Sequence, residues 1–144
     1  MDIAIIGAGY AGLVSAAGWA SLGNDVTCIE RDQGKVKMIN SGRPLTTEPG
    51  LAEEVGTQVA AGRLRATADF KAVKEAEIVF ISVGTPAGPD GSQDLSQVRD
   101  CADALSRSIE EEPTIVMRST VLPGLQRGWS EGGSGKMAPL SGLL

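Results

Sequence analysis

The chain has 144 residues, of which 42% are hydrophobic and 22% are charged, and its formal net charge is −5. This length predicts one domain with its own core. The acidic balance argues against nucleic acid or an anionic membrane as a partner, because either favours a basic face. No apolar run approaches the roughly 20 residues of a membrane span, and no basic leader precedes the first strand-like run, so we expect a cytoplasmic protein.

The residues that most often carry acid–base and metal chemistry are scarce. The chain has no histidine, which removes the commonest general base and a common metal ligand. Its two cysteines, Cys28 and Cys101, form no metal-ligand pattern, and we interpret them as buried, reduced thiols. Ser-His and Cys-His nucleophiles are therefore excluded, and we expect neither a metal site nor a catalytic residue within this chain.

Short apolar runs rich in β-branched residues alternate with segments of helical character. This alternation predicts a βαβ series with a parallel sheet that is buried on both faces. In chain order we expect strand 3–6, helix 11–22, strand 26–29, helix 33–40, helix 51–61, a weaker strand 64–67, strand 78–82, helix 95–109 and strand 114–119.

The sequence changes character after Pro123. Residues 124–144 contain six glycines and show neither helical nor strand periodicity. We expect residues 1–124 to form the folded domain and residues 125–144 to form an irregular tail.

A glycine-rich motif joins the first expected strand to the first expected helix. In "GAGYAG", Gly7 permits a tight turn, Gly9 lets the backbone approach a pyrophosphate, and Gly12 lets the helix pack closely on the sheet. The helix N-terminus then offers N–H groups to the phosphates. With a strand before it and a small-residue helix after it, the motif predicts a dinucleotide site.

An acidic residue at the end of the second strand bears on which dinucleotide binds. Glu30 follows Gly7 by 23 positions, where a carboxylate accepts hydrogen bonds from an adenosine ribose and repels a 2′-phosphate. This favours NAD over NADP. The neighbouring Arg31 argues in the opposite direction, because an arginine at this place can accommodate the 2′-phosphate of NADP. The same stretch also fits FAD and looks much like the amino-terminal signature of flavin amine oxidases. Up to Asp32 the choice between NAD and FAD stays open.

Three later motifs favour NAD. They are "PLTTEPGL" (44–51), "ISVGTP" followed by "DLSQV" (81–86 and 94–98), and "RSTVLPG" (118–124). In this order after the glycine motif, they resemble the NAD-binding half of the UDP-glucose/GDP-mannose 6-dehydrogenase family. The likeness runs from Met1 to about Gly124. The residues of "RSTVLPG" resemble the GDP-mannose branch more than the UDP-glucose branch, but this motif alone does not identify the sugar.

The resemblance implies a Rossmann-type doubly wound α/β fold with strand order 3-2-1-4-5 and NAD as cofactor. It also implies a set of cofactor-binding residues. The glycine motif would bind the pyrophosphate, an acid and a lysine would bind the adenosine ribose, and two threonines would line the nicotinamide side. In the same order, these residues are Gly7, Gly9, Tyr10, Ala11 and Gly12; Glu30 and Lys35; and Thr85 and Thr120. Glu48 is either a further residue near the cofactor or an ordinary loop carboxylate.

Members of this family oxidise the C6 alcohol of a nucleotide sugar to a carboxylate with two NAD, through a cysteine thiol in a "GGSCLPKD"-like motif. That motif does not occur here, and neither Cys28 nor Cys101 has its context. We therefore expect a truncated family member whose sixth strand is missing, leaving an exposed apolar edge at 114–119. The isolated chain should bind the cofactor without turnover, whereas the full-length protein should be a homo-oligomer that binds a nucleotide sugar. Two alternatives remain: a flavoprotein fragment and a non-catalytic NAD-binding module.

Overall fold

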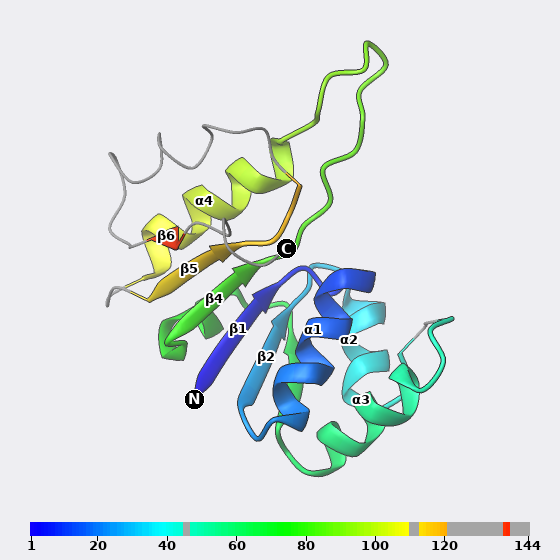
Figure 1. Ribbon diagram of the computed structural model, residues 1–144. Helices are drawn as coiled ribbons and strands as arrows, with labels where there is room; N and C mark the ends of the chain where they lie inside the picture. Colours follow the sequence, from blue (N-terminus) through cyan, green and yellow to red (C-terminus); the bar gives the residue numbers. More distant parts are fainter. Residues whose placement is uncertain (45–46, 110–112, 121–136, 139–144) are drawn as a thin grey trace.

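A six-stranded parallel sheet lies at the centre of the computed structural model, which describes residues 1–44, 47–109, 113–120 and 137–138 (Figure 1). The strands lie in the order β3-β2-β1-β4-β5-β6, and every neighbouring pair is parallel. Their bounds are β1 (Asp2–Ile6), β2 (Asp25–Ile29), β3 (Leu64–Thr67), β4 (Ile78–Ile81), β5 (Thr114–Met117) and β6 (Met137–Ala138).

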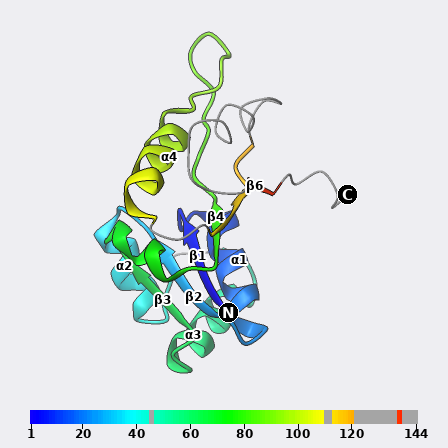
Figure 2. The same ribbon diagram turned by 90° about the vertical axis from the view of Figure 1, so that its left-hand side faces the viewer.

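Helices cover both faces of this sheet, as parallel strands require. One face carries α1 (Tyr10–Ser21), α2 (Gln33–Asn40) and α3 (Leu51–Ala60), and the other carries α4 (Ser96–Ser108) (Figures 1 and 2). A short 3₁₀ helix, η1 (Phe70–Glu75), lies on the α4 side. None of the helices in the described residues has the length and apolar character needed to cross a membrane.

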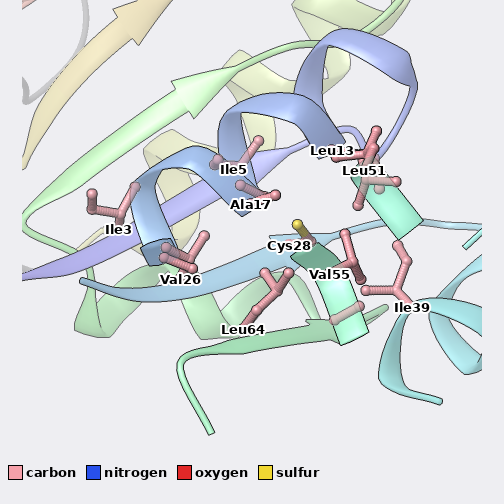
Figure 3. Packing of buried hydrophobic residues seen from close by; sticks show 14 of the residues in the cluster. Ile3, Ile5, Leu13, Ala17, Val26, Cys28, Ile39, Leu51, Val55 and Leu64 are labelled. Atoms are coloured by element: carbon pink, nitrogen blue, oxygen red, sulfur yellow. The ribbon is translucent and has the colours of Figure 1, made fainter. Parts of the chain in front are cut away.

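The alternation of side chains along each strand divides the core into two clusters. In β1, Ile3 and Ile5 belong to the cluster beneath α1, α2 and α3, whereas Ala4 and Ile6 belong to the cluster beneath α4 and η1. Figure 3 shows the first cluster, where Val55 of α3 lies near Cys28 of β2 and Leu64 of β3. Because both sheet faces are buried, the strands read as continuous apolar runs in the sequence.

The expected elements are present, with small shifts at their ends. The predicted strand order 3-2-1-4-5 is confirmed. The predicted strands 78–82 and 114–119 end earlier, at Ile81 and Met117, so that Ser82 and Ser119 fall in the turns that follow. The 3₁₀ helix η1 was not predicted.

The prediction of a missing sixth strand is wrong. Met137–Ala138 forms β6, which pairs in parallel with Ile115 and Val116 of β5, so part of the edge expected to be exposed is paired. This strand could not be predicted, because two residues are too few to show any periodicity. The remainder of the predicted irregular tail, apart from Met137–Ala138, lies outside the described residues.

At the opposite edge of the sheet, a side chain pairs with one residue of β3. The amide of Asn40, at the end of α2, accepts a hydrogen bond from the N–H of Ala66 (2.7 Å) and donates one to the carbonyl of Ala66 (2.8 Å). The side-chain amide thereby makes the same pair of hydrogen bonds that one residue of a neighbouring strand would make with β3. This pairing satisfies the backbone of Ala66, which would otherwise be open to another chain.

We expect Asn40→Ala to lower the free energy of unfolding by about 1–3 kcal/mol, because two backbone groups of β3 lose their partner together. Urea unfolding followed by circular dichroism measures this change. Gln33→Ala, at an exposed position of the same helix, is the matched control and should change stability by less than about 0.5 kcal/mol. Equal effects of the two substitutions would contradict the role given to Asn40.

Candidate functional site

The turn between β1 and α1 packs so closely on the end of β4 that Gly7 has no room for a side chain. Gly7 has a φ of +95°, and a Cβ added to it would lie 2.7 Å from the carbonyl oxygen of Ser82. Its N–H donates to the carbonyl of Ile29, at the end of β2, over 2.9 Å. The turn therefore contacts both strands that flank β1, and only glycine fits here.

The other two glycines of the motif differ from each other in their surroundings. A Cβ on Gly12 would collide with the carbonyl oxygen of Gly7, so Gly12 is required for the contact between helix and turn. A Cβ on Gly9 would meet nothing within 4 Å, and the φ of Gly9 is an ordinary −70°. The fold itself therefore has no need of glycine at position 9, where the missing side chain leaves the surface open to a ligand.

The N-terminus of α1 opens onto this surface. Gly9 is the N-cap of α1 and provides no side-chain hydrogen bond, and the first turn, which includes Tyr10, Ala11 and Gly12, carries no acidic residue. The first N–H groups of a helix lack partners within the helix, and the helix dipole adds positive potential there. This end of α1 can therefore accept an anion such as a pyrophosphate.

Glu30 lies beside the glycine turn and is held in place by three partners. Its carboxylate accepts hydrogen bonds from the N–H of Ala8 (3.2 Å) and the N–H of Asp32 (3.0 Å), and it lies 3.8 Å from the ammonium of Lys35. The Glu30 side chain is only 13% exposed. Lys35 belongs to α2, whose first turn is capped by the carboxylate of Asp32. The predicted ribose-binding pair therefore comes together.

A cleft of about 410 Å³ lies beside these residues at the carboxyl ends of β1, β2 and β4. Gly7, Gly9, Glu30 and Lys35 line it. Its other wall comes from α4, from the start of η1 and from the segment before η1. It includes residues that were not predicted to bind: Ala68, Phe70, Gln97, Asp100, Cys101 and Ala104. The sequence predicted a helix over 95–109, but nothing in the sequence indicated that one of its faces lines a cleft.

The two cysteines lie in different surroundings, and neither is an activated nucleophile. Burial raises the pKa of the Cys28 thiol to about 12, and the nearby Glu30 carboxylate raises it further. Burial also raises the pKa of Cys101 to about 11, although Arg31 acts in the opposite direction. Both thiols are therefore protonated near neutral pH, whereas nucleophilic chemistry needs the thiolate.

The two predicted threonines meet at the carboxyl edge of the sheet. The Thr85 hydroxyl, in the turn after β4, donates to the carbonyl of Thr120, after β5, over 3.0 Å. Neither residue lines the 410 Å³ cleft. The predicted residues thus form two groups, one around the glycine turn and Glu30 and one around Thr85 and Thr120.

A second cleft of about 510 Å³ lies on the other side of Gly9, against α1, α2 and the start of α3. Tyr10 and Lys35 line it together with Thr47 and Leu51. The Tyr10 hydroxyl donates to the carboxylate of Glu48 over 3.0 Å, and this contact raises the pKa of Tyr10. Glu48 is therefore linked to the glycine motif through Tyr10.

Comparison with known proteins identifies the family. Residues 1–131 match the model of the UDP-glucose/GDP-mannose dehydrogenase family, NAD binding domain. The chain belongs to this family. This match confirms the predicted family and cofactor, and it decides between the NAD and FAD interpretations in favour of NAD.

Individual relatives show the same likeness. UDP-glucose 6-dehydrogenase of Pseudomonas aeruginosa is 44% identical over 125 residues, which cover 86% of this chain and 28% of that protein. A UDP-glucose dehydrogenase from Pyrobaculum islandicum has a similar structure, with a TM-score of 0.86 and 34% identity over 94% of this chain and 34% of that one. The structure of GDP-mannose dehydrogenase from Pseudomonas aeruginosa is also similar, with a TM-score of 0.83 and 33% identity. The match covers 95% of this chain and 35% of that one. The chain thus spans about a third or less of these family members.

We expect Cys101 to react slowly with a maleimide at pH 7 and about tenfold faster for each pH unit up to pH 9, because its pKa of about 11 limits the thiolate. Cys28, which is fully buried, should stay unlabelled in the folded protein. Peptide mapping by mass spectrometry measures both sites, and labelling in denaturant is the control in which both react. Labelling of Cys28 before Cys101 would contradict this assignment.

Proposed function

We propose that this chain binds NAD⁺ as the cofactor domain of a nucleotide-sugar 6-dehydrogenase. The observation that carries the proposal is the combination of an open surface at Gly9 with a fixed carboxylate at Glu30. The N-terminus of α1 would hold the pyrophosphate, and Glu30 with Lys35 would bind the hydroxyls of the adenosine ribose. The adenosine half would occupy the 410 Å³ cleft.

The nicotinamide half would extend toward Thr85 and Thr120, which lie at the carboxyl ends of β4 and β5. In open α/β sheets, ligands bind at this edge, near the point where the strand order reverses. Here the order reverses between β1 and β4. The proposed cofactor residues are those that the resemblance implies: Gly7, Gly9, Tyr10, Ala11, Gly12, Glu30, Lys35, Thr85 and Thr120.

In the reaction of the whole protein, the C6 alcohol of a nucleotide sugar would be oxidised to the carboxylate with two NAD⁺. This chain would contribute the cofactor site and no nucleophile, since both of its thiols have raised pKa values. We therefore propose that residues 1–144 bind NAD⁺ without oxidising UDP-glucose or GDP-mannose. We also propose that the full-length protein is a homo-oligomer and that it is located in the cytoplasm.

We expect Gly9→Ala to weaken NAD⁺ binding at least about tenfold, because the new methyl group would occupy the surface that the pyrophosphate approaches. The free energy of unfolding should change by less than about 1 kcal/mol, since the added Cβ meets nothing within 4 Å. Isothermal titration calorimetry and urea unfolding measure the two quantities.

Gly18→Ala is the matched control, because Gly18 lies in the same helix and a Cβ there also meets nothing within 4 Å. It should leave NAD⁺ affinity unchanged. If Gly9→Ala bound NAD⁺ as tightly as the Gly18→Ala variant, the pyrophosphate would not lie at Gly9.

We expect Glu30→Gln to reduce the preference for NAD⁺ over NADP⁺ by about tenfold or more. The substitution keeps the shape of the side chain but removes the charge that repels a 2′-phosphate, while Lys35 and Arg31 remain beside it. The ratio of the two dissociation constants at fixed salt measures the effect. Glu53→Gln, in the first turn of α3, is the charge-matched control. An unchanged ratio would place the ribose elsewhere.

A further inference from the structure

Gln93 joins the two segments that carry the predicted threonines. The loop after β4 folds back on itself through an antiparallel bridge between Ala87 and Gln93 and a hydrogen bond from the N–H of Asp94 to the carbonyl of Pro86 (2.8 Å). In Figure 1 this loop projects beyond the carboxyl edge of the sheet before the chain enters α4. Gln93 lies at the base of the loop, where its half-buried side chain reaches across to the turn after β5.

The amide of Gln93 completes a three-residue hydrogen-bond cluster. Its Nε2 donates to the carbonyl of Thr120 over 2.7 Å and approaches the Thr85 hydroxyl at 3.4 Å. The Thr85 hydroxyl donates to the same Thr120 carbonyl. This carbonyl therefore has both lone pairs occupied, and the reversed amide would place an oxygen against another acceptor. The orientation of Gln93 is fixed by this contact.

The arrangement leaves the Oε1 of Gln93 buried and without a hydrogen-bond partner among the described residues. An unsatisfied buried acceptor is unfavourable, so the contacts made by Nε2 must outweigh its cost. The hydrogen bonds of Gln93 to Thr120 and Thr85 therefore contribute to holding these two segments together.

The cluster also determines what Thr85 can offer to a ligand. A threonine hydroxyl has one proton, and in Thr85 that proton is already donated to Thr120. Toward a ligand the Thr85 oxygen is therefore an acceptor. It suits a hydrogen-bond donor such as a ribose hydroxyl or a carboxamide N–H, and it does not suit a phosphate oxygen.

We propose that Gln93 is a positioning residue that holds Thr85 as an acceptor for a donor group on the nicotinamide–ribose half of the cofactor. The inference rests on the proposed NAD⁺ site and assigns a role to a residue that the predicted site does not contain. Gln93 acts through Thr85 and Thr120 and does not itself contact the cofactor.

The experiment compares dissociation constants for NAD⁺, ADP-ribose and ADP in the wild-type chain and in Gln93→Ala. We expect Gln93→Ala to weaken NAD⁺ binding about three- to tenfold, the effect of one hydrogen bond, and to change ADP binding less than twofold. ADP lacks the whole nicotinamide–ribose half. If the variant weakens the binding of ADP-ribose as much as the binding of NAD⁺, the donor is a ribose hydroxyl. If ADP-ribose is unaffected, the donor is the carboxamide.

A second variant separates positioning from a general effect on the loop. Gln93→Glu places a carboxylate against the Thr120 carbonyl at pH 8, and its carboxyl regains a donor proton as the pH falls toward 5. The NAD⁺ affinity of this variant relative to wild type should therefore recover between pH 8 and pH 5, whereas the ratio for Gln93→Ala should stay flat. Asp90 and Asp94 on the same loop have lowered pKa values and remain ionised across this range.

Three results would overturn the inference. They are equal weakening of NAD⁺ and ADP by Gln93→Ala, unchanged NAD⁺ binding by that variant, and no recovery of Gln93→Glu at low pH. Failure of the proposed function looks different, because the wild-type chain would then bind neither NAD⁺ nor ADP, and the inference would fall with it. Thermal unfolding of both variants confirms that each is compared in its folded form.

Discussion

The close contact between the glycine turn and the end of β4 is the constraint on which the rest of the site depends. Side chains at Gly7 or Gly12 would collide with the carbonyl of Ser82 or of Gly7 itself. Without that contact, α1 could not begin so close to the carboxyl ends of β1 and β4, the two paired strands between which the strand order reverses. The helix N-terminus, the open surface at Gly9 and the cleft beside it all follow from how closely these backbone segments approach.

Glu30 extends this constraint to the next strand. Because its carboxylate accepts a hydrogen bond from the N–H of Ala8, the expected ribose-binding group is tied to the expected pyrophosphate-binding turn. A second backbone bond, from Asp32, fixes the start of the segment that leads into α2. The two proposed subsites are thereby held at one spacing before any ligand arrives, which would reduce the ordering that binding must bring about.

Most of the fold could be predicted because a buried parallel strand and an amphipathic helix leave strong patterns in the sequence. Spacing relative to the strands pointed to the glycine motif and Glu30, and the family resemblance pointed to the two threonines; the structure places all of them at the carboxyl ends of strands. By contrast, β6 has only two residues, and the cleft wall formed by Gln97, Asp100 and Cys101 depends on how α4 packs. The link from Gln93 to Thr120 joins segments 27 residues apart, and no local pattern encodes it.

The electrostatics of the described residues favour holding a cofactor over attacking a substrate. A nucleophilic thiol needs nearby positive charge to lower its pKa, and it must be accessible. At Cys101 the favourable effect of Arg31 is smaller than the effect of burial, and at Cys28 the carboxylate of Glu30 opposes ionisation in addition to burial. That carboxylate is also the group proposed to bind the ribose. Burial and this carboxylate together keep the Cys28 thiol protonated, so neither thiol of the described residues suits the nucleophilic step of the proposed reaction.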